Sequence, residues 1–298
     1  MFQTRYSTLA LTLMVSLSAS AVDGQSIRAD LASDNVVNKK FTVQDTDMDF
    51  YIHHRKDVKK KFTSNPEYFY FWHGDHQTAY PFMNLTTILS NNNTLNKRGA
   101  ISMALDAPDG RWNSENNMPL VVADSIGKQY RHETGYRNEV SVGYDTGVAP
   151  AYRFACENKK NIVVAVAGGL YENESCEAKN MSVLFTMNQG DLIFPYDKDS
   201  SFTAGERLGL TERRDGKRTI DALKGLLNCS SVVESEARMS TTYSYSCEND
   251  NQLFVVMGNS ALHQWNGYSN VSDGAFGMQG KPQKPAVTHW LYSEFGVK

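Results

Sequence analysis

Short apolar runs alternate with longer amphipathic stretches along most of this chain. The runs have the length and composition of buried strands. They are YFYFW (68–72), GAISMALDA (99–107), NEVSVGYD (138–145), NIVVAVAGG (161–169), MSVLFTMNQ (181–189) and QLFVVMGNS (252–260). The alternating stretch FTVQDTDMDFYIHH (41–54) predicts a hairpin or edge strands. Amphipathic patterns predict helices over residues 81–96, 119–133, 148–160, 217–227 and 285–296.

This alternation predicts an α/β fold, with a mostly parallel central sheet and helices on both of its faces. No repeat, low-complexity tract or linker divides the chain, so we expect a single domain over residues 41–298. The first residues, MFQTRYSTLALTLMVSLSASA, combine an early arginine, a short apolar core and a small-x-small ending. They predict a signal peptide over residues 1–21, a polar leader over 22–40 and a secreted, extracellular protein.

Composition excludes some classes of function. The chain is 41% hydrophobic with a net charge of −3, so no basic surface indicates binding to nucleic acid. No apolar run after the signal peptide is long enough to cross a bilayer, so we expect no membrane span.

The four cysteines form an even number in an exported chain, which predicts two disulfides. Three pairings can be drawn. We expect Cys156–Cys176 and Cys229–Cys247, because local pairs close the shortest loops. Six N-x-S/T sequons predict a glycoprotein with these loops at its surface. They begin at Asn84, Asn92, Asn173, Asn180, Asn228 and Asn270.

Polar residues that follow the predicted strands form a candidate site, because function in parallel sheets gathers at the carboxyl ends of the strands. Residues 143–147, Gly-Tyr-Asp-Thr-Gly, have the form of a G-x-S-x-G nucleophile elbow with aspartate in place of serine. Asp145, Asp191 and His263 follow in the order nucleophile, acid, histidine, as in α/β hydrolases. We therefore expect these three side chains to meet at one rim of the sheet.

Several motifs, in order from about residue 45 to the end, resemble the secreted poly(3-hydroxybutyrate) depolymerase and feruloyl esterase group of α/β hydrolases. The motifs are FWHGDHQTA (71–79), RWN (111–113), GYDTGVAPAYRFAC (143–156), VAVAGG (164–169), NQGDLIFPYDK (188–198), LLNCSS (226–231), ALHQWNG (261–267) and HWLYSEFG (289–296). The resemblance implies an α/β-hydrolase fold and carboxylic-ester hydrolysis as the parent activity, with no cofactor. Asp191 matches the family's acid and His263 its histidine, while Cys156 and Cys229 match disulfide cysteines.

By the same resemblance, the backbone of Asp75, His76 and Thr146 supplies the oxyanion hole. The family's nucleophilic serine is replaced by Asp145 in this sequence. A carboxylate that attacks an ester carbonyl forms a mixed anhydride, which is more reactive than the ester. We therefore expect this chain to be deficient in serine-esterase turnover.

Two alternatives remain for the function. The chain is either a non-catalytic pseudoenzyme that binds a small-molecule or polymer ester or an extracellular glycan, or a hydrolase whose Asp145 attacks sp³ carbon in an epoxide or haloalkane. For the second, Trp72, Tyr144 and Trp265 are candidate substrate-binding residues that could assist the leaving group.

Two further readings of the site are disfavoured. Ser141 is a weaker candidate nucleophile, because it lies in a strand before the turn. His73, Asp75 and His76 lack the spacing of zinc-binding helices, so we expect no metal.

Overall fold

The computed structural model describes residues 37–43, 46–54, 67–75, 77–85, 100–136, 138–197, 213–237, 240–259, 263, 268–269 and 281–282. The expected signal peptide and the expected helix at 285–296 lie outside the described residues. Among the described helices, none is long and apolar enough to cross a membrane.

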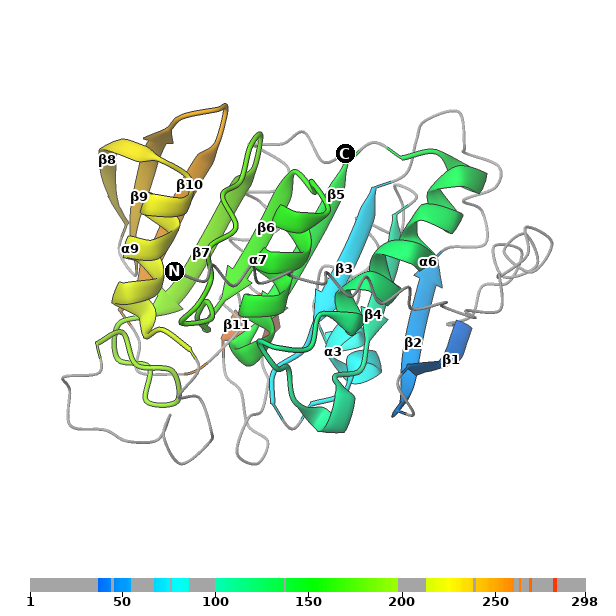
Figure 1. Ribbon diagram of the computed structural model, residues 1–298. Coiled ribbons are helices and arrows are strands. Elements are labelled where there is room, and N and C mark those ends of the chain that lie inside the picture. Colours follow the sequence, from blue (N-terminus) through cyan, green and yellow to red (C-terminus); the bar gives the residue numbers. More distant parts are fainter. Residues whose placement is uncertain are drawn as a thin grey trace, which may run out of the picture.

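One large twisted sheet runs through the described part of the molecule (Figure 1). Its ten strands lie in the order β1-β2-β4-β3-β5-β6-β7-β10-β9-β8. The strands are β1 (Val37–Val43), β2 (Thr46–His54), β3 (Tyr68–Trp72), β4 (Ile101–Leu105), β5 (Glu139–Tyr144), β6 (Ile162–Val166), β7 (Ser182–Asn188), β8 (Cys229–Ala237), β9 (Ser240–Cys247) and β10 (Gln252–Gly258). A separate pair consists of β11 (Tyr268–Ser269) and β12 (Lys281–Pro282).

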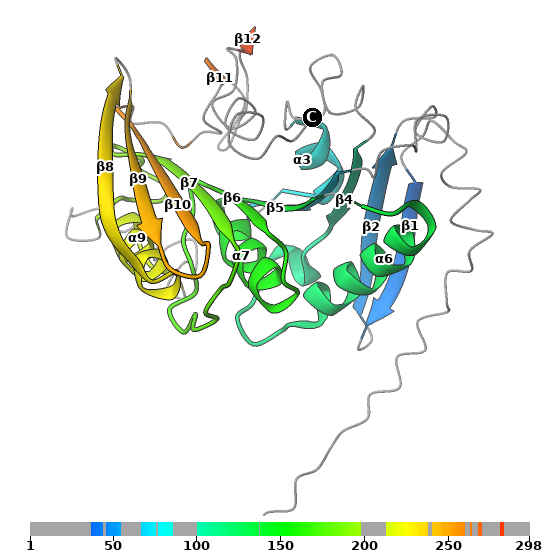
Figure 2. The ribbon, with the colours of Figure 1, turned by 90° about the horizontal axis from the view of Figure 1, so that it is seen from above.

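The six central strands from β4 to β10 are parallel, and the two pairs at the sheet edges are antiparallel. This order and these directions are those of the α/β-hydrolase fold, so the predicted fold class is confirmed. Figure 2 shows α6 (Met118–Thr134), α7 (Val148–Glu157) and α9 (Gly216–Leu226) on one face of the sheet and α3 (Ala79–Leu85) on the other.

Alternation along each strand divides the core between these two faces. Phe69 and Phe71 of β3 pack on the α3 face with Phe82. Tyr70 and Trp72 of the same strand pack on the opposite face among residues of α6 and α7. All five residues of β3 are buried, which explains why its sequence reads as one continuous aromatic run.

The structure adds to the expected elements at both edges of the sheet. β1 begins at Val37, inside the stretch expected to be a polar leader, and pairs with β2 as a hairpin. The hairpin of β8 and β9 was not predicted. Its strands are rich in serine and threonine and lie outside the apolar core, so they lack the pattern of buried strands.

Both disulfides have the expected local pairing. Cys156 at the end of α7 bonds Cys176, across a sequence separation of 20 residues. Cys229 bonds Cys247 across 18 residues and ties the start of β8 to the end of β9. No described cysteine is free.

A buried charge network lies at the opposite end of β5 from the elbow. Lys160 Nζ lies 3.0 Å from Asp124 Oδ1 and 3.1 Å from Glu139 Oε1. Arg131 pairs with the same Glu139, and its Nη1 also donates to the Tyr70 hydroxyl. Burial alone would raise the pKa of Asp124, but Lys128 and Lys160 hold it below its usual value. The network joins β5 to α6 and to the loop after α7.

Replacing Lys160 with methionine tests this network. The change removes one of the two cations that Asp124 and Glu139 share, while Arg131 still contacts both carboxylates. We expect the free energy of unfolding to fall by about 2–3 kcal/mol, because two buried charge-assisted hydrogen bonds are lost. Urea unfolding followed by circular dichroism measures the loss. The control is Lys128→Met, whose side chain is 69% exposed and should cost less than about 1 kcal/mol. Equal losses for the two variants would contradict the special role of Lys160.

Candidate active site

A strained turn joins β5 to α7 at the expected elbow. Asp145 has a φ of +53°, in the left-handed region that side chains with a Cβ rarely adopt. The turn also needs close backbone packing on both sides. A Cβ on Gly143 would lie 2.4 Å from the carbonyl oxygen of Gly147, and one on Gly147 would lie 2.1 Å from that of Trp72. Glycine at both positions is therefore a steric requirement of this turn.

The two carboxylate oxygens of Asp145 have different environments. Oδ2 accepts a hydrogen bond from the backbone N–H of Asp75 at 3.3 Å, and the backbone N–H of Thr146 also stabilises the carboxylate. These are two of the three backbone positions expected to form an oxyanion hole. Oδ1 is buried and has no hydrogen-bond partner among the described residues. The turn thus holds one oxygen in place and leaves the other to face His263.

His263 lies between two carboxylates. Its Nδ1 donates to Asp191 Oδ2 at 2.8 Å, and its Nε2 lies 3.8 Å from Asp145 Oδ1. Asp191 Oδ1 accepts from the backbone N–H groups of Ile193 and Phe194 at 2.9 and 2.8 Å. Asp145, Asp191 and His263, predicted to meet at one rim of the sheet, therefore come together after β5, β7 and β10.

Burial and charge shift the pKa values of this group in ways that favour proton transfer. Desolvation, with a smaller contribution from Asp75, raises the pKa of Asp145 to about 6, although His263 and two backbone N–H groups oppose the shift. Burial disfavours the charged form of His263. The hydrogen bond to Asp191 and the charges of Asp145 and Asp191 outweigh it and raise the pKa of His263 overall. The raised pKa of His263 favours its imidazolium form, which the carboxylates of Asp145 and Asp191 flank.

Tyr144 lies against His263, and its role in substrate binding stays a prediction. Its ring lies 5.2 Å from the imidazole, centroid to centroid, and its hydroxyl donates to the His263 carbonyl at 3.4 Å. Burial raises the pKa of Tyr144 well above its usual value, so the hydroxyl stays protonated.

The expectation that Trp72 binds substrate is wrong. Strand alternation turns its side chain to the α6 and α7 face, where it is 1% exposed. Its Nε1 donates to Ser141 Oγ at 2.9 Å, and that hydroxyl donates to the Ala151 carbonyl at 2.8 Å. The same two bonds show that Ser141 links β5 to α7 inside the core and is no nucleophile.

The structure describes only some of the other predicted site residues. His76 and Trp265 lie outside the described residues. His73 accepts from the Ala107 N–H at Nε2, at 3.0 Å, and donates from Nδ1 to the Gly74 carbonyl, so its role is structural. Of the sequon asparagines, the side chain of Asn84 and the residues Asn92 and Asn270 are not described. Those with exposed positions are Asn173, Asn180 and Asn228.

Two residues that brace the site were given no role from the sequence. Trp112 Nε1 donates to the His73 carbonyl at 2.7 Å. Arg213 Nη2 donates to the carbonyls of Trp112 at 3.1 Å and Thr146 at 3.3 Å. Trp112 lies within the RWN motif, but Arg213 falls outside every predicted element and carried no signal. Together they hold the segments that supply the two N–H donors to Asp145.

Asp75 adds a carboxylate that the sequence did not assign to the site. The Thr146 hydroxyl donates to Asp75 Oδ1 at 2.9 Å, which fixes Asp75 beside the turn. Within the described residues, no cluster of three or more histidine, cysteine or carboxylate side chains is arranged to hold a metal ion.

The sequence matches no protein-family model and no curated protein. Similar solved structures include a thermostable esterase, with 14% identity, a TM-score of 0.44 and coverage of 61% of this chain and 54% of that chain. A ferulic acid esterase has 13% identity, a TM-score of 0.41 and coverage of 61% and 90%. A carboxylesterase from Mesorhizobium loti has 10% identity, a TM-score of 0.44 and coverage of 78% and 93%. The match spans about half the length of the thermostable esterase.

Asp145→Asn tests the electrostatics of the site. Folding raises the pKa of Asp145 to about 6, so the buried charge destabilises the folded state above that pH. This cost decreases as the pH falls toward the pKa that Asp145 has in the unfolded chain. At about pH 8 we expect the variant to be more stable than the wild type by on the order of 2 kcal/mol. The gain should vanish near pH 4. Urea unfolding across this pH range measures the gain in stability. A gain that does not depend on pH would contradict the raised pKa of Asp145.

Proposed function

We propose that this chain is a hydrolase in which the Asp145 carboxylate attacks a saturated carbon, with an epoxide or a similarly strained cyclic ether as its substrate. The observation that carries the proposal is that the two oxygens of the Asp145 carboxylate have different environments. Oδ2 accepts a hydrogen bond from the backbone N–H of Asp75, while Oδ1 has no hydrogen-bond partner among the described residues and faces His263 Nε2 at 3.8 Å.

In the first step, Asp145 Oδ1 attacks a ring carbon of the epoxide and the carbon–oxygen bond of the ring breaks. An alkyl ester forms on Asp145, and the leaving alkoxide takes the proton of His263 Nε2. The raised pKa of His263 supports this acid role, because it favours the protonated imidazole from which the step starts. The step consumes one negative and one positive charge and leaves a neutral ester beside a neutral imidazole.

In the second step, the now neutral His263 acts as a base. The ester on Asp145 no longer carries the charge that helped to hold the proton on Nε2, so the pKa of His263 falls. A water molecule gives its proton to Nε2 and its oxygen attacks the Asp145 carbonyl carbon. The oxyanion forms at Oδ2, where the N–H groups of Asp75 and Thr146 stabilise it. When the intermediate collapses, the bond between the Asp145 carbonyl carbon and the alkyl oxygen breaks, and that oxygen takes the proton from His263 Nε2 to give a diol. The carboxylic acid left on Asp145 then gives its proton to the same nitrogen, which restores the carboxylate and the imidazolium.

The described contacts favour an epoxide over a haloalkane. Halide departure needs N–H or O–H donors at the leaving group, and the Trp72 N–H is already bonded to Ser141. Epoxide opening instead needs a proton, which His263 carries. Serine-esterase chemistry is disfavoured for a separate reason, since the carboxylate itself occupies the two N–H donors that an ester oxyanion would need.

The alternative is a protein that binds an ester or glycan ligand without turnover. The same ion pair between Asp145 and His263 would then serve to close the site. We also propose that the protein is secreted and glycosylated. Its two disulfides are typical of oxidising compartments.

Trapping the covalent intermediate tests the proposal. Rapid acid quench of the wild type during turnover of styrene oxide should trap an alkyl adduct on Asp145, because acid removes the neutral imidazole that the second step needs as its base. Peptide mass spectrometry locates the adduct, and Asp145→Asn treated in the same way is the matched control. Wild-type turnover in ¹⁸O-labelled water should also place the label in the Asp145 carboxylate. Absence of both adduct and label, with ligand binding intact, would favour the binding protein.

A serine at the elbow tests the remaining machinery. Wild-type protein should not hydrolyse p-nitrophenyl butyrate above background. Asp145→Ser removes the carboxylate from the two N–H donors and supplies a hydroxyl to His263, so we expect esterase turnover that a further His263→Ala abolishes. Wild-type esterase activity that depends on His263 would contradict the inference about Asp145.

A further inference from the structure

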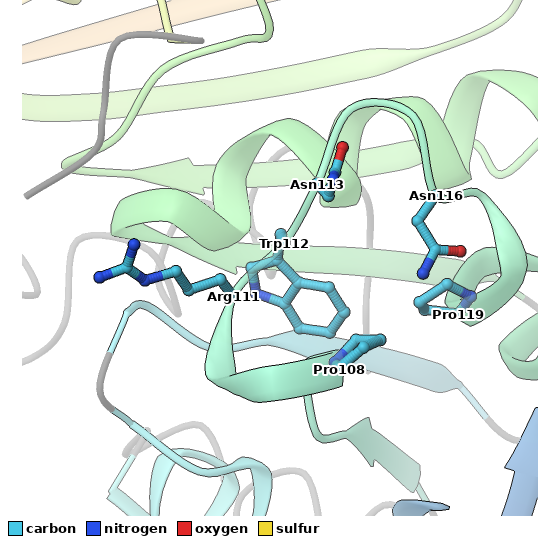
Figure 3. A pocket seen from close by; sticks show the side chains of 6 residues that line it. All are labelled: Pro108, Arg111, Trp112, Asn113, Asn116 and Pro119. Atoms are coloured by element: carbon cyan, nitrogen blue, oxygen red, sulfur yellow. The ribbon is translucent and has the colours of Figure 1, made fainter. Parts of the chain in front are cut away.

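A small pocket lies on the loop that leads into α6, and neither Asp145 nor His263 is among its lining residues. Trp112, which braces the Asp145 site, also lines this pocket. It has a volume of about 250 Å³. Figure 3 shows the Trp112 indole in the middle of the pocket, with Arg111 on one side of it and Asn116 and Pro119 on the other. The six residues that line it are Pro108, Arg111, Trp112, Asn113, Asn116 and Pro119.

The polar groups of this pocket are all hydrogen-bond donors. Asn113 Oδ1 accepts from the Glu115 backbone N–H at 2.7 Å, and Asn116 Oδ1 accepts from that of Met118 at 3.1 Å. These bonds fix which end of each carboxamide is oxygen and turn both NH₂ groups away from the backbone. No described residue accepts a hydrogen bond from either NH₂ group or pairs with the Arg111 guanidinium. The pocket therefore combines the positive charge of Arg111 with the NH₂ donors of two asparagines.

The apolar part of the pocket is rigid. The Trp112 N–H is bonded to the His73 carbonyl, and Arg213 binds the Trp112 carbonyl. Arg153 also donates to the Ser114 carbonyl at 2.7 Å, which fixes the same loop to α7. The indole ring and two proline rings thus form a fixed apolar surface beside the donors, so little ordering is needed when a ligand binds.

From this arrangement we propose a second binding site, for a small organic carboxylate that carries an apolar ring. The carboxylate would accept from the Arg111 guanidinium and from the amides of Asn113 and Asn116, while the ring would pack against Trp112, Pro108 and Pro119. A sugar fits less well, because it brings no negative charge to the Arg111 guanidinium. A cationic ligand is disfavoured by Arg111, and Glu115 on the same loop is not part of the lining. The site does not depend on the chemistry of Asp145.

Benzoate is the probe for this site, measured by isothermal titration calorimetry with the full chain. We expect saturable binding to the wild type, and weaker binding by about tenfold or more after Arg111→Gln, because a hydrogen-bonded charge is lost. Asn116→Asp should abolish it, since the change keeps the acceptor for the Met118 N–H and replaces the donor with a second carboxylate. Lys128→Gln, an exposed cation outside the pocket, should bind benzoate as the wild type does.

Methyl benzoate separates the carboxylate from the ring and should bind much more weakly than benzoate. The proposal is overturned if the wild type shows no saturable binding, or if Arg111→Gln and Asn116→Asp bind as it does. Equal affinity for methyl benzoate would overturn the choice of a carboxylate. Asp145→Asn should leave benzoate binding unchanged, which distinguishes failure of this site from failure of the proposed hydrolase. Thermal unfolding of each variant verifies that it is folded.

Discussion

The left-handed backbone conformation of Asp145 is the constraint on which the site depends. It turns the chain sharply from β5 into α7, and it does so only because Gly143 and Gly147 allow backbone atoms to approach more closely than a Cβ would permit. The turn places the Asp145 carboxylate beside its own following N–H and beside the end of β3. Strain of this kind persists only where the surrounding structure holds it. Here Arg213 supplies part of that support, through the Thr146 carbonyl.

Charge balance inside the site follows from this geometry. Two carboxylates, those of Asp145 and Asp191, contact the buried imidazole of His263 and stabilise its charged form. Burial and the nearby charge of Asp75 make the charge of Asp145 costly. A reaction that removes one charge of each sign at the same moment relieves this cost. Alkylation of Asp145 with proton loss from His263 is such a reaction.

The sequence predicted the parts of this structure that depend on local pattern. Apolar runs located the central strands, and the rule that strand ends converge placed Asp145, Asp191 and His263 together. The sequence did not predict which face of the sheet a side chain occupies. Trp72 ends its strand beside the site, but alternation sends its ring to the other face. Contacts between segments that are far apart in the sequence, such as that of Arg213 with Trp112, were also missed, because the pattern of apolar and polar residues does not indicate them.

The environment of His263 argues that the site is functional and not merely structural. Asp191 already accepts two backbone hydrogen bonds on Oδ1, so its carboxylate has partners apart from the histidine. His263 Nε2 is buried and has no hydrogen-bond partner among the described residues, which costs stability. A histidine present only for stability would satisfy both ring nitrogens, as His73 does. An imidazole that directs its unsatisfied nitrogen at an equally unsatisfied carboxylate oxygen is arranged to exchange a proton with a group that enters between them.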